Sequence, residues 1–359
     1  MQQESKKNYV GIDLGKRKLD AIRIDHNGSF ERRNFSTDMT GRNMLIKWLK
    51  PNDKVALETG NLAFLIAEMI QNKKIEVYVL NAGQLQLIYN SLKKTDKEDS
   101  LKLARLVQRI PVEELPVVRI PDEYEKQARA LLTNQEYWVT SRTRAYNYLH
   151  SLLCNNGITT VTKKELKNAD FRKAIINSLD KNYKKLAESV EEEVILADKK
   201  LDDIEDQIIE LLKEKKEETK IVMSVCGIGK VTALAILGYI GTDCNRFKHV
   251  KQVAYYAGLV PRVDQSGTLD KRLGIIKGGS HHLKRLIVQG AWSVIRSKNG
   301  GILKAKYEEL IKRKPKGKAI IAIARKMIEL VYTLLKKREY CNYMPLLELN
   351  KKLAVNKIF

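Results

Sequence analysis

Four acidic residues stand where they could bind metal ions. Asp13 ends the apolar segment YVGI and Glu58 ends the apolar segment VAL, and a glycine follows each acid two residues later. Asp96 and Asp99 lie in KKTDKEDS, where a spacing of three residues places both carboxylates on one face of a helix. Cleavage of a phosphodiester needs its charge neutralised, and two divalent ions roughly 4 Å apart supply this. The four acids therefore predict a site for two Mg²⁺ or Mn²⁺ ions.

Taken singly, each acid has a simpler interpretation. Asp13 is also typical of a turn after a strand, and Glu58 of a helix cap. Asp96 and Asp99 are also typical of an exposed helix face. The combination is more informative, because an acid on the first strand, one on a later strand and two on the next helix follow the order of the RNase H-like nuclease fold. Without cations such a cluster would repel itself, which agrees with the nearby lysines Lys16, Lys18, Lys93, Lys94 and Lys97.

The elements that must hold these acids alternate between strand and helix. Three strand-like segments come first, with a turn at His26-Asn27-Gly28 between the second and the third, which predicts an antiparallel meander. Helices and further strands then alternate, which predicts a mixed α/β sheet. We expect strands at 9–13, 19–24, 30–35, 54–58 and 75–80, and helices at about 41–50, 61–73 and 83–109.

The rest of the chain is predicted to be mostly helical. ELPVVRIPDEY indicates an extended linker, and a long helix follows over about 122–155. A heptad pattern of apolar residues over 194–211 predicts an antiparallel helical hairpin or a dimerisation arm. The expected domains are a catalytic domain (1–110), a linker with a helical coiled-coil arm (111–220), a mostly α-helical C-terminal domain (221–340) and a tail (341–359).

The segment VCGIGKVTALAILGYIG places Gly227 and Gly229 in a turn before a helix. The pattern is similar to a helix-hairpin-helix element, whose backbone N–H groups can hold a phosphate. A glycine-containing turn between two packed helices explains the same residues equally well.

Composition indicates a polyanionic partner. Lys and Arg number 66 against 43 Asp and Glu, giving a net charge of +23, which favours nucleic acid over an anionic membrane; a generally basic protein is the alternative. The four cysteines form no CxxC pair, which argues against a zinc site and favours a reducing compartment. No segment approaches the roughly 20 apolar residues of a membrane span. We therefore expect a cytoplasmic protein that binds no membrane.

Several motifs together resemble one family. GIDLGKRKLD, ALETG and KTDKEDS are similar to the acidic motifs of DEDD transposases with a RuvC-like (RNase H-like) domain. These are insertion-sequence recombinases related to the Piv DNA invertases. VCGIGKVTALAILGYIG, RFKHVKQVAYYAGLVPRVDQSGT and GIIKGGSHHLKRLIVQGAW resemble their second conserved domain. The resemblance covers most of the chain except the helical arm.

The resemblance implies a serine nucleophile, which matches Ser266 in VDQSGT. From the residues alone, a Ser-Gly turn in a loop is the simpler interpretation. Cations could neutralise the phosphate under attack or otherwise contact nucleic acid. These candidates are Lys16, Arg17, Lys18, Arg262, Lys271, Arg272, Lys277, Lys284 and Arg285.

The region around residue 280 departs slightly from the family pattern. Related proteins commonly have Asn at the position of Ser280, Arg at Lys284 and Ala at Ser100. Ser280 is expected to cap a helix. Because a polar helix start explains His281 and His282, we leave both histidines out of the catalytic set.

The family implies a recombinase that cleaves and exchanges DNA strands through a serine–DNA link. Its implied partners are donor and target DNA, a structured bridge RNA, and further subunits in a dimer or tetramer. A Piv-like invertase without RNA, a junction-resolving nuclease that uses only the acids, and a non-catalytic nucleic-acid-binding protein remain as alternatives.

Overall fold

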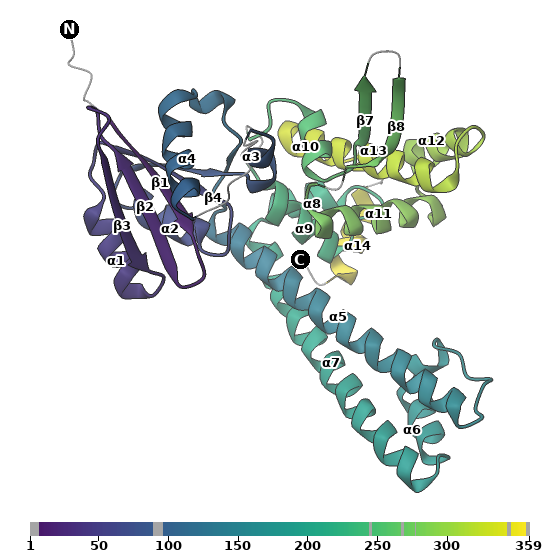
Figure 1. Cartoon of the computed structure of the whole chain (residues 1–359). Helices are drawn as coiled ribbons and strands as arrows, with labels where there is room; N and C mark the ends of the chain where they lie inside the picture. The colour runs from purple at the N-terminus through teal and green to yellow at the C-terminus, as the bar shows by residue number, and fades with distance from the viewer. Residues whose placement is uncertain are drawn as a thin grey trace. The chain divides into compact units, whose positions relative to one another are not determined.

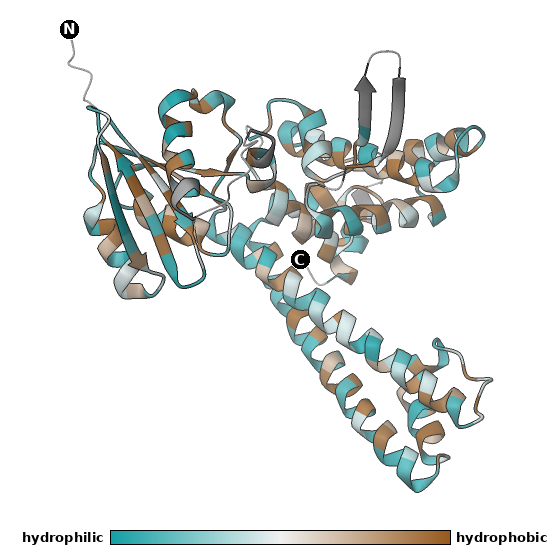
Figure 2. Cartoon of the chain, viewed as in Figure 1, coloured by the Kyte–Doolittle hydropathy of each residue, from teal (hydrophilic) through white to brown (hydrophobic). Residues whose placement is uncertain are grey.

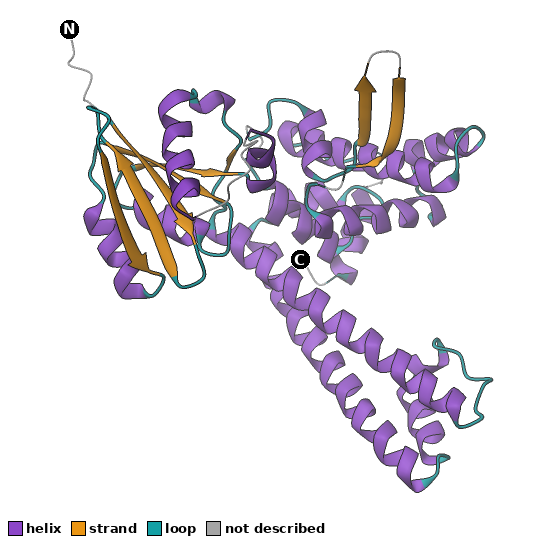
Figure 3. Cartoon of the chain, viewed as in Figure 1, coloured by secondary structure: helices purple, strands orange, loops and turns teal. Residues whose placement is uncertain are grey.

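A computed structural model of the chain describes residues 7–88, 96–243, 246–266, 269–276, 278–342 and 346–356. The chain divides into two compact units, Met1–Asp122 and Glu123–Phe359. The first unit is a β-sheet with helices, and the second is mostly helical (Figure 1; Figure 3). In the described residues, no helix combines the length and the apolar character needed to cross a membrane.

The sheet of the first unit is mixed, as predicted. Its described strands lie in the order β3-β2-β1-β4-β5-β6. β1 pairs antiparallel with β2 and parallel with β4, and β4 pairs parallel with β5. The predicted meander is therefore confirmed. The strands are β1 (Asn8–Leu14), β2 (Lys18–Ile24), β3 (Phe30–Ser36), β4 (Asp53–Glu58), β5 (Glu76–Leu80) and β6 (Val117–Val118).

β6 lies in the segment expected to be a linker. Its two residues pair antiparallel with the end of β5, so this stretch closes the sheet edge of the first unit. The opposite edge strand, β3, is largely hydrophilic (Figure 2), which suits a strand with one side open to water.

Helices cover both faces of the sheet. One face packs Val10, Ile12 and Leu57 into an apolar cluster with α1 (Met39–Trp48) and α2 (Ala63–Gln71). The other face packs Ala56 and Leu80 into a smaller cluster with α3 (Ala82–Ile88) and α4 (Asp96–Arg109). Side chains alternate between faces along a strand, so β1 and β4 contribute to both clusters. A short 3₁₀ turn (Val112–Glu114) follows α4.

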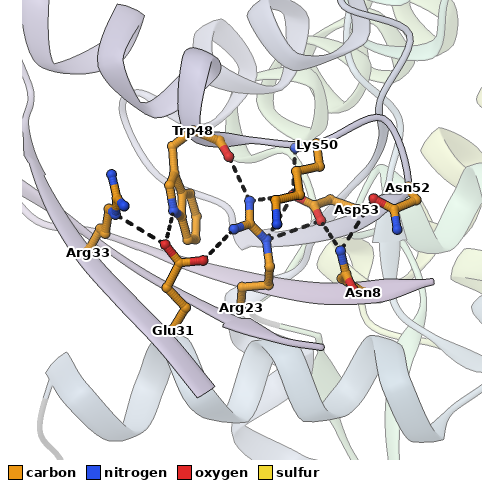
Figure 4. A network of polar contacts seen from close by, with 8 residues as sticks. All are labelled: Asn8, Arg23, Glu31, Arg33, Trp48, Lys50, Asn52 and Asp53. Atoms are coloured by element: carbon orange, nitrogen blue, oxygen red, sulfur yellow. Dashed lines mark hydrogen bonds and ion pairs between the residues drawn. The ribbon is translucent and has the colours of Figure 1, made fainter. Parts of the chain in front are cut away.

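A buried ion network lies at the end of the sheet where strands β1 and β4 begin. The Arg23 guanidinium donates to both carboxylate oxygens of Asp53, to Glu31 and to the carbonyl of Trp48 (Figure 4). Its carbon Cζ also lies 3.9 Å from the centre of the Trp48 ring. Asn8 donates a further hydrogen bond of 2.9 Å to Asp53. The side chain of Arg23 is 3% exposed and that of Asp53 fully buried, so each charge depends on the other.

The second unit begins with the predicted helical arm. α5 (Glu123–Asn155) and α7 (Lys181–Glu214) run side by side (Figure 1). The apolar repeat lies between them, with Val194, Ala197 and Ile204 buried. The helical hairpin is therefore confirmed. A 3₁₀ turn (Glu165–Lys167) and α6 (Ala169–Asn177) form its tip, where the buried Arg172 pairs with Glu191 at 2.6 Å.

The remaining helices of this unit share one large apolar cluster. They are α8 (Lys216–Met223), α9 (Lys230–Ile240), α10 (Val250–Tyr256), α11 (His281–Arg296), α12 (Gly301–Ile311), α13 (Lys316–Lys337) and α14 (Leu346–Val355).

A β-hairpin interrupts these helices. β7 (Pro261–Ser266) and β8 (Leu269–Ile275) pair antiparallel and project from the helices of their unit (Figure 3). The expectation that Ser266 lies in a loop is wrong, because Ser266 is the last residue of β7 and pairs with Leu269. PRVDQS lacks the apolar alternation of a strand with a buried face, and Lys271 interrupts that alternation in LDKRLGI, so their cross-strand pairing left little signal in the sequence.

Candidate active site

Asp13 and Glu58 are neighbours at the ends of two paired strands. β1 and β4 run parallel, with Gly11 opposite Ala56 and Ile12 opposite Leu57. Asp13 and Glu58 are the next residue on each strand, so they continue the same register. Their carboxylates therefore start from adjacent positions on one face of the sheet. Both residues are half-buried.

Helix α4 packs on that same face, directly over Gly11. A Cβ atom at Gly11 would overlap the carbonyl oxygen of Ser100 and lie 2.5 Å from the amide nitrogen of Ala104. The helix therefore rests on bare backbone, two residues before Asp13 on the strand. This contact brings the helix that carries Asp96 and Asp99 to the face that carries Asp13 and Glu58.

The helix acids are less fully defined. The half-buried Asp99 accepts a bond of 3.1 Å from Lys102 one turn along α4. Asp96 is the first residue of α4, and its side chain lies outside the described residues. Among the side chains described, no three acids, histidines or cysteines come close enough to hold a metal ion. The structure thus brings Asp13 and Glu58 together and places Asp99 on the adjacent helix without closing a three-acid group.

A fifth acid, absent from the sequence prediction, ties α4 to the sheet. Asp20 lies opposite Asp13 on β2 and is 3% exposed. It accepts bonds from the Ser100 hydroxyl at 3.2 Å and from Arg32 at 3.1 Å. Ser100 follows Asp99 directly, so this contact fixes the start of α4 against β2. The sequence offered no signal for Asp20, because β2 also carries Lys18 and Arg23, and Ser100 stands in the charged segment DKEDSLK.

The acids at the strand ends fit a divalent cation. Two half-buried carboxylates in adjacent register repel each other unless a cation lies near them. Carboxylate oxygens are also the ligands that Mg²⁺ and Mn²⁺ prefer. The backbone contact at Gly11 leaves room for no side chain between strand and helix, which holds the acid-bearing helix close.

The cations predicted near the acids are exposed. Lys16, Arg17 and Lys18 all lie in or next to the turn from β1 to β2, where Gly15 N–H donates to the carbonyl of Lys18 at 3.0 Å. They are therefore accessible to a ligand at the end of β1.

The residues predicted in the C-terminal part are only partly described. Arg262 is exposed on β7. The side chains of Ser266, Lys271 and Arg272, and all of Lys277, lie outside the described residues.

The start of α11 is a charged cluster. The Ser280 hydroxyl accepts from the amide of Leu283, which confirms the predicted cap. Glu136 on α5 lies 3.1 Å from both His282 and Arg285. Burial lowers the pKa of His282 below its ordinary value, although the Glu136 carboxylate opposes this shift. Lys284 packs beside Gly258, at 3.1 Å from where a Cβ atom would lie.

The glycine turn between α8 and α9 is closely packed. Gly227 has a φ of +82°, and a Cβ atom there would overlap the carbonyl oxygen of Gly290 on α11. Nothing lies within 4 Å of a Cβ atom placed at Gly229. Gly227 thus serves the packing of α11 on the turn, which supports the simpler of the two interpretations for this residue.

Two family models match the chain. One, described as "Transposase IS116/IS110/IS902 family", matches residues 219–308, and a DEDD transposase model of the IS110 group, described as "Transposase", matches residues 10–156. Together they cover about two thirds of the chain. The chain belongs to the IS110/IS116 transposase family. The match over residues 10–156 contains all four predicted acids, and the match over residues 219–308 contains Ser266.

Individual relatives of this transposase agree with the family. The transposase for insertion sequence element IS1111A of Coxiella burnetii is 27% identical over 70% of this chain and 69% of its own length. The pilin gene-inverting protein of Moraxella bovis is 25% identical over 92% of this chain and 96% of its own length. The transposase for insertion sequence element IS1328 of Yersinia enterocolitica is 24% identical over 79% and 82%, respectively.

Family membership makes the protein an enzyme that cleaves DNA and transfers strands, and the DEDD group implies dependence on a divalent metal. The resemblance identified from the acidic motifs is confirmed.

A buried lysine next to the glycine turn predicts how the stability of the transposase depends on pH. Lys352 on α14 donates to the carbonyls of Met223 at 2.6 Å and Val225 at 3.3 Å. Burial lowers its pKa from 10.5 to about 8. Between these two values the unfolded chain binds more protons than the folded chain, so stability should rise with pH, by about 3 kcal/mol across the window.

Urea unfolding of the second unit between pH 7.5 and 10.5 tests this expectation. Lys352→Met keeps the apolar stem and removes the titrating amine, so the variant should lose this part of the pH dependence. Equal pH slopes for the native protein and the variant would contradict the prediction.

Proposed function

We propose that this transposase cleaves and exchanges DNA strands with divalent ions at its acids and Ser266 as the nucleophile. The observation that carries the proposal is the shared register of Asp13 and Glu58 beneath the helix that carries Asp96 and Asp99. An RNase H-like, RuvC-like identity for the first unit is supported by its strand order, with three antiparallel strands followed by two parallel ones.

The four acids would hold Mg²⁺ or Mn²⁺, with the strand acids as the rigid part of the site. Bound divalent ions would neutralise charge on the phosphate and clamp the attacking and leaving oxygens. The chain's own contribution is placement: β1 and β4 fix two carboxylates, and α4 carries the other two.

Ser266 would act on the phosphorus atom of the DNA backbone. Its hydroxyl loses a proton, the Oγ–P bond forms, and the bond from phosphorus to one ester oxygen breaks. That oxygen leaves with a proton as a free hydroxyl. In strand exchange this hydroxyl would attack the serine-linked phosphorus of a second strand, the Oγ–P bond would break, and a proton would return to the serine oxygen. Arg262, Arg272 and Lys277 are the candidates to stabilise the phosphate, with Lys284 and Arg285 as further contacts.

The proposal includes the partners implied by the family. The net charge of +23 supports binding of RNA and DNA together. A bridge RNA would select the target, and subunits would join as a dimer or tetramer through the helical arm. Sequencing of the nucleic acid that co-purifies with the protein tests the RNA. Recovery of DNA only would favour an invertase that acts without RNA.

That invertase is the second candidate, and one observation favours it. The pilin gene-inverting protein of Moraxella bovis aligns with 92% of this chain. A junction-resolving nuclease, which would use the acids alone, is the third candidate.

Two variants distinguish these functions. Incubated with Mg²⁺, guide RNA and labelled DNA, the native protein should form a covalent protein–DNA adduct that survives denaturation. Ser266→Ala should form no adduct and exchange no strands, whereas a nuclease would still cut. The double change Asp13→Asn and Asp99→Asn should stop all DNA processing. If DNA processing survives that double change, the metal-site hypothesis fails.

A further inference from the structure

A hollow of about 400 Å³ opens at the end of the sheet where strands β1 and β4 stop. Its walls come from the turn after β1 and from the loop after β4. The acids Asp13 and Glu58 are the residues that immediately precede these two segments. The lining consists of Leu14, Gly15, Lys16, Thr37, Asn61 and Leu62.

The chemistry of this lining suits one nucleotide. Among the described residues that line it, Lys16 is the only ionisable one and none carries a carboxylate. Leu14 and Leu62 form an apolar floor that packs on the α1–α2 cluster, on the face of the sheet opposite to the one that carries Asp13 and Glu58. The exposed amide of Asn61 offers both a donor and an acceptor. The Lys16 cation suits a phosphate, and the apolar floor suits a sugar or the face of a base. The Asn61 amide suits the edge of a base.

The turn that carries Lys16 is held in place. The Thr37 hydroxyl donates to the carbonyl of Lys16 at 3.1 Å, and the Thr37 amide donates to the carbonyl of Arg17 at 3.2 Å. The Gly15 amide closes the turn on Lys18. Because the backbone of the turn is already fixed, only the Lys16 side chain loses freedom when it pairs with a phosphate. The entropy cost is therefore smaller than for a lysine on a mobile loop.

We propose that this hollow binds the nucleotide next to the phosphate that is cut, with the flanking phosphate paired to Lys16. The inference rests on the proposed function, because it takes the acids at the strand ends as the cleavage site. Because the acids face α4 and the floor of the hollow faces α1 and α2, a DNA backbone would pass around the strand ends from the acids to Lys16. Asn61 and the floor would then select for an intact base.

DNA with single methylphosphonates, which lack the charge of one phosphate, tests the contact. Binding is measured in Asp13→Asn protein, so that loss of cleavage cannot affect the result. Lys16→Ala should weaken binding of natural DNA about tenfold and lower the salt slope by about one phosphate contact. On DNA with a methylphosphonate at the matching position, Lys16→Ala should cause no further loss.

Lys73→Ala is the matched control, because Lys73 is exposed in the turn before β5, at the opposite edge of the sheet. It should change binding less than twofold at every methylphosphonate position. If the loss of DNA affinity from Lys16→Ala multiplies the loss from the methylphosphonate at every position, then Lys16 contacts no phosphate and the proposal is overturned.

A second variant tests the hollow itself. Asn61→Trp places an indole in the hollow from an exposed position, so folding should be preserved. It should weaken binding of intact DNA about tenfold and bind DNA that is abasic at the matching position almost normally. Equal binding of intact DNA by the variant and its parent would overturn the proposal. Failure of the cleavage site itself would appear separately, as cutting by the Asp13→Asn parent.

Discussion

Gly11→Ala is expected to lower the rate of DNA cleavage by at least about 100-fold. The new Cβ atom would overlap the carbonyl oxygen of Ser100. The backbone fixes the position of the Cβ atom and the atom it meets is itself backbone, so no rotamer change relieves the clash, and α4 must move away from β1. A displacement of about 1 Å in a catalytic site costs about 100-fold. Overpacking should also lower the free energy of unfolding, by about 3 kcal/mol.

Gly60→Ala is the control, because no atom lies within 4 Å of a Cβ atom at Gly60, two residues after Glu58. This variant should retain cleavage within about twofold and unfold as the native protein does. Cleavage rates on labelled DNA and urea unfolding curves provide both measurements. Full activity of Gly11→Ala would show that the position of α4 does not control cleavage.

Arg23→Met should destabilise the first unit by about 3–5 kcal/mol, because it leaves the carboxylate of Asp53 buried without its cation. The change conserves the apolar stem that lies against Trp48. Urea unfolding followed by Trp48 fluorescence measures the effect, in a background with phenylalanine at Trp138 and Trp292.

Two further variants identify the cause of that loss. Arg33→Met removes an exposed guanidinium 3.2 Å from Glu31 and should cost less than about 1 kcal/mol. Asp53→Asn added to Arg23→Met removes the unpaired charge and keeps an acceptor for the Lys50 amide, so it should restore part of the stability. No recovery in the double variant would point to lost packing as the cause.

Regular apolar patterns made much of the fold predictable. The strands at residues 8–14 and 53–58 follow from short apolar runs, and the helical arm follows from its heptad repeat. The location of Asp13 and Glu58 at strand ends follows from the same pattern. Their adjacency needs the parallel pairing of β1 with β4, which becomes certain only with the register.

Buried charges and the hairpin were not predictable in this way. Arg23 and Asp53 are charged residues whose burial depends on each other across 30 positions of sequence. Asp20 is buried because Ser100 and Arg32 bond to it. β8 carries charged residues on both of its alternating positions, and β7 has a single aliphatic side chain, Val263, so their pairing was not evident from an apolar pattern.

The unequal apolar clusters on the two faces of the sheet have an energetic consequence. The described α1–α2 cluster contains many more buried side chains than the cluster beneath α4. Proteins open locally in cooperative pieces, and a piece with fewer buried apolar contacts opens at lower cost. We therefore expect Asp13 and Glu58 to lose their positions only when the whole unit unfolds. Asp96 and Asp99 would lose theirs when α4 alone opens, which costs less free energy.

In the proposed site, metal binding and the order of α4 would consequently be linked. A cation that is held jointly by acids of the strands and the helix favours the closed arrangement by mass action. The affinity measured for that cation then includes the work of closing the helix. In a cell, free divalent ion concentration would thus set the fraction of protein molecules that are ready to cut.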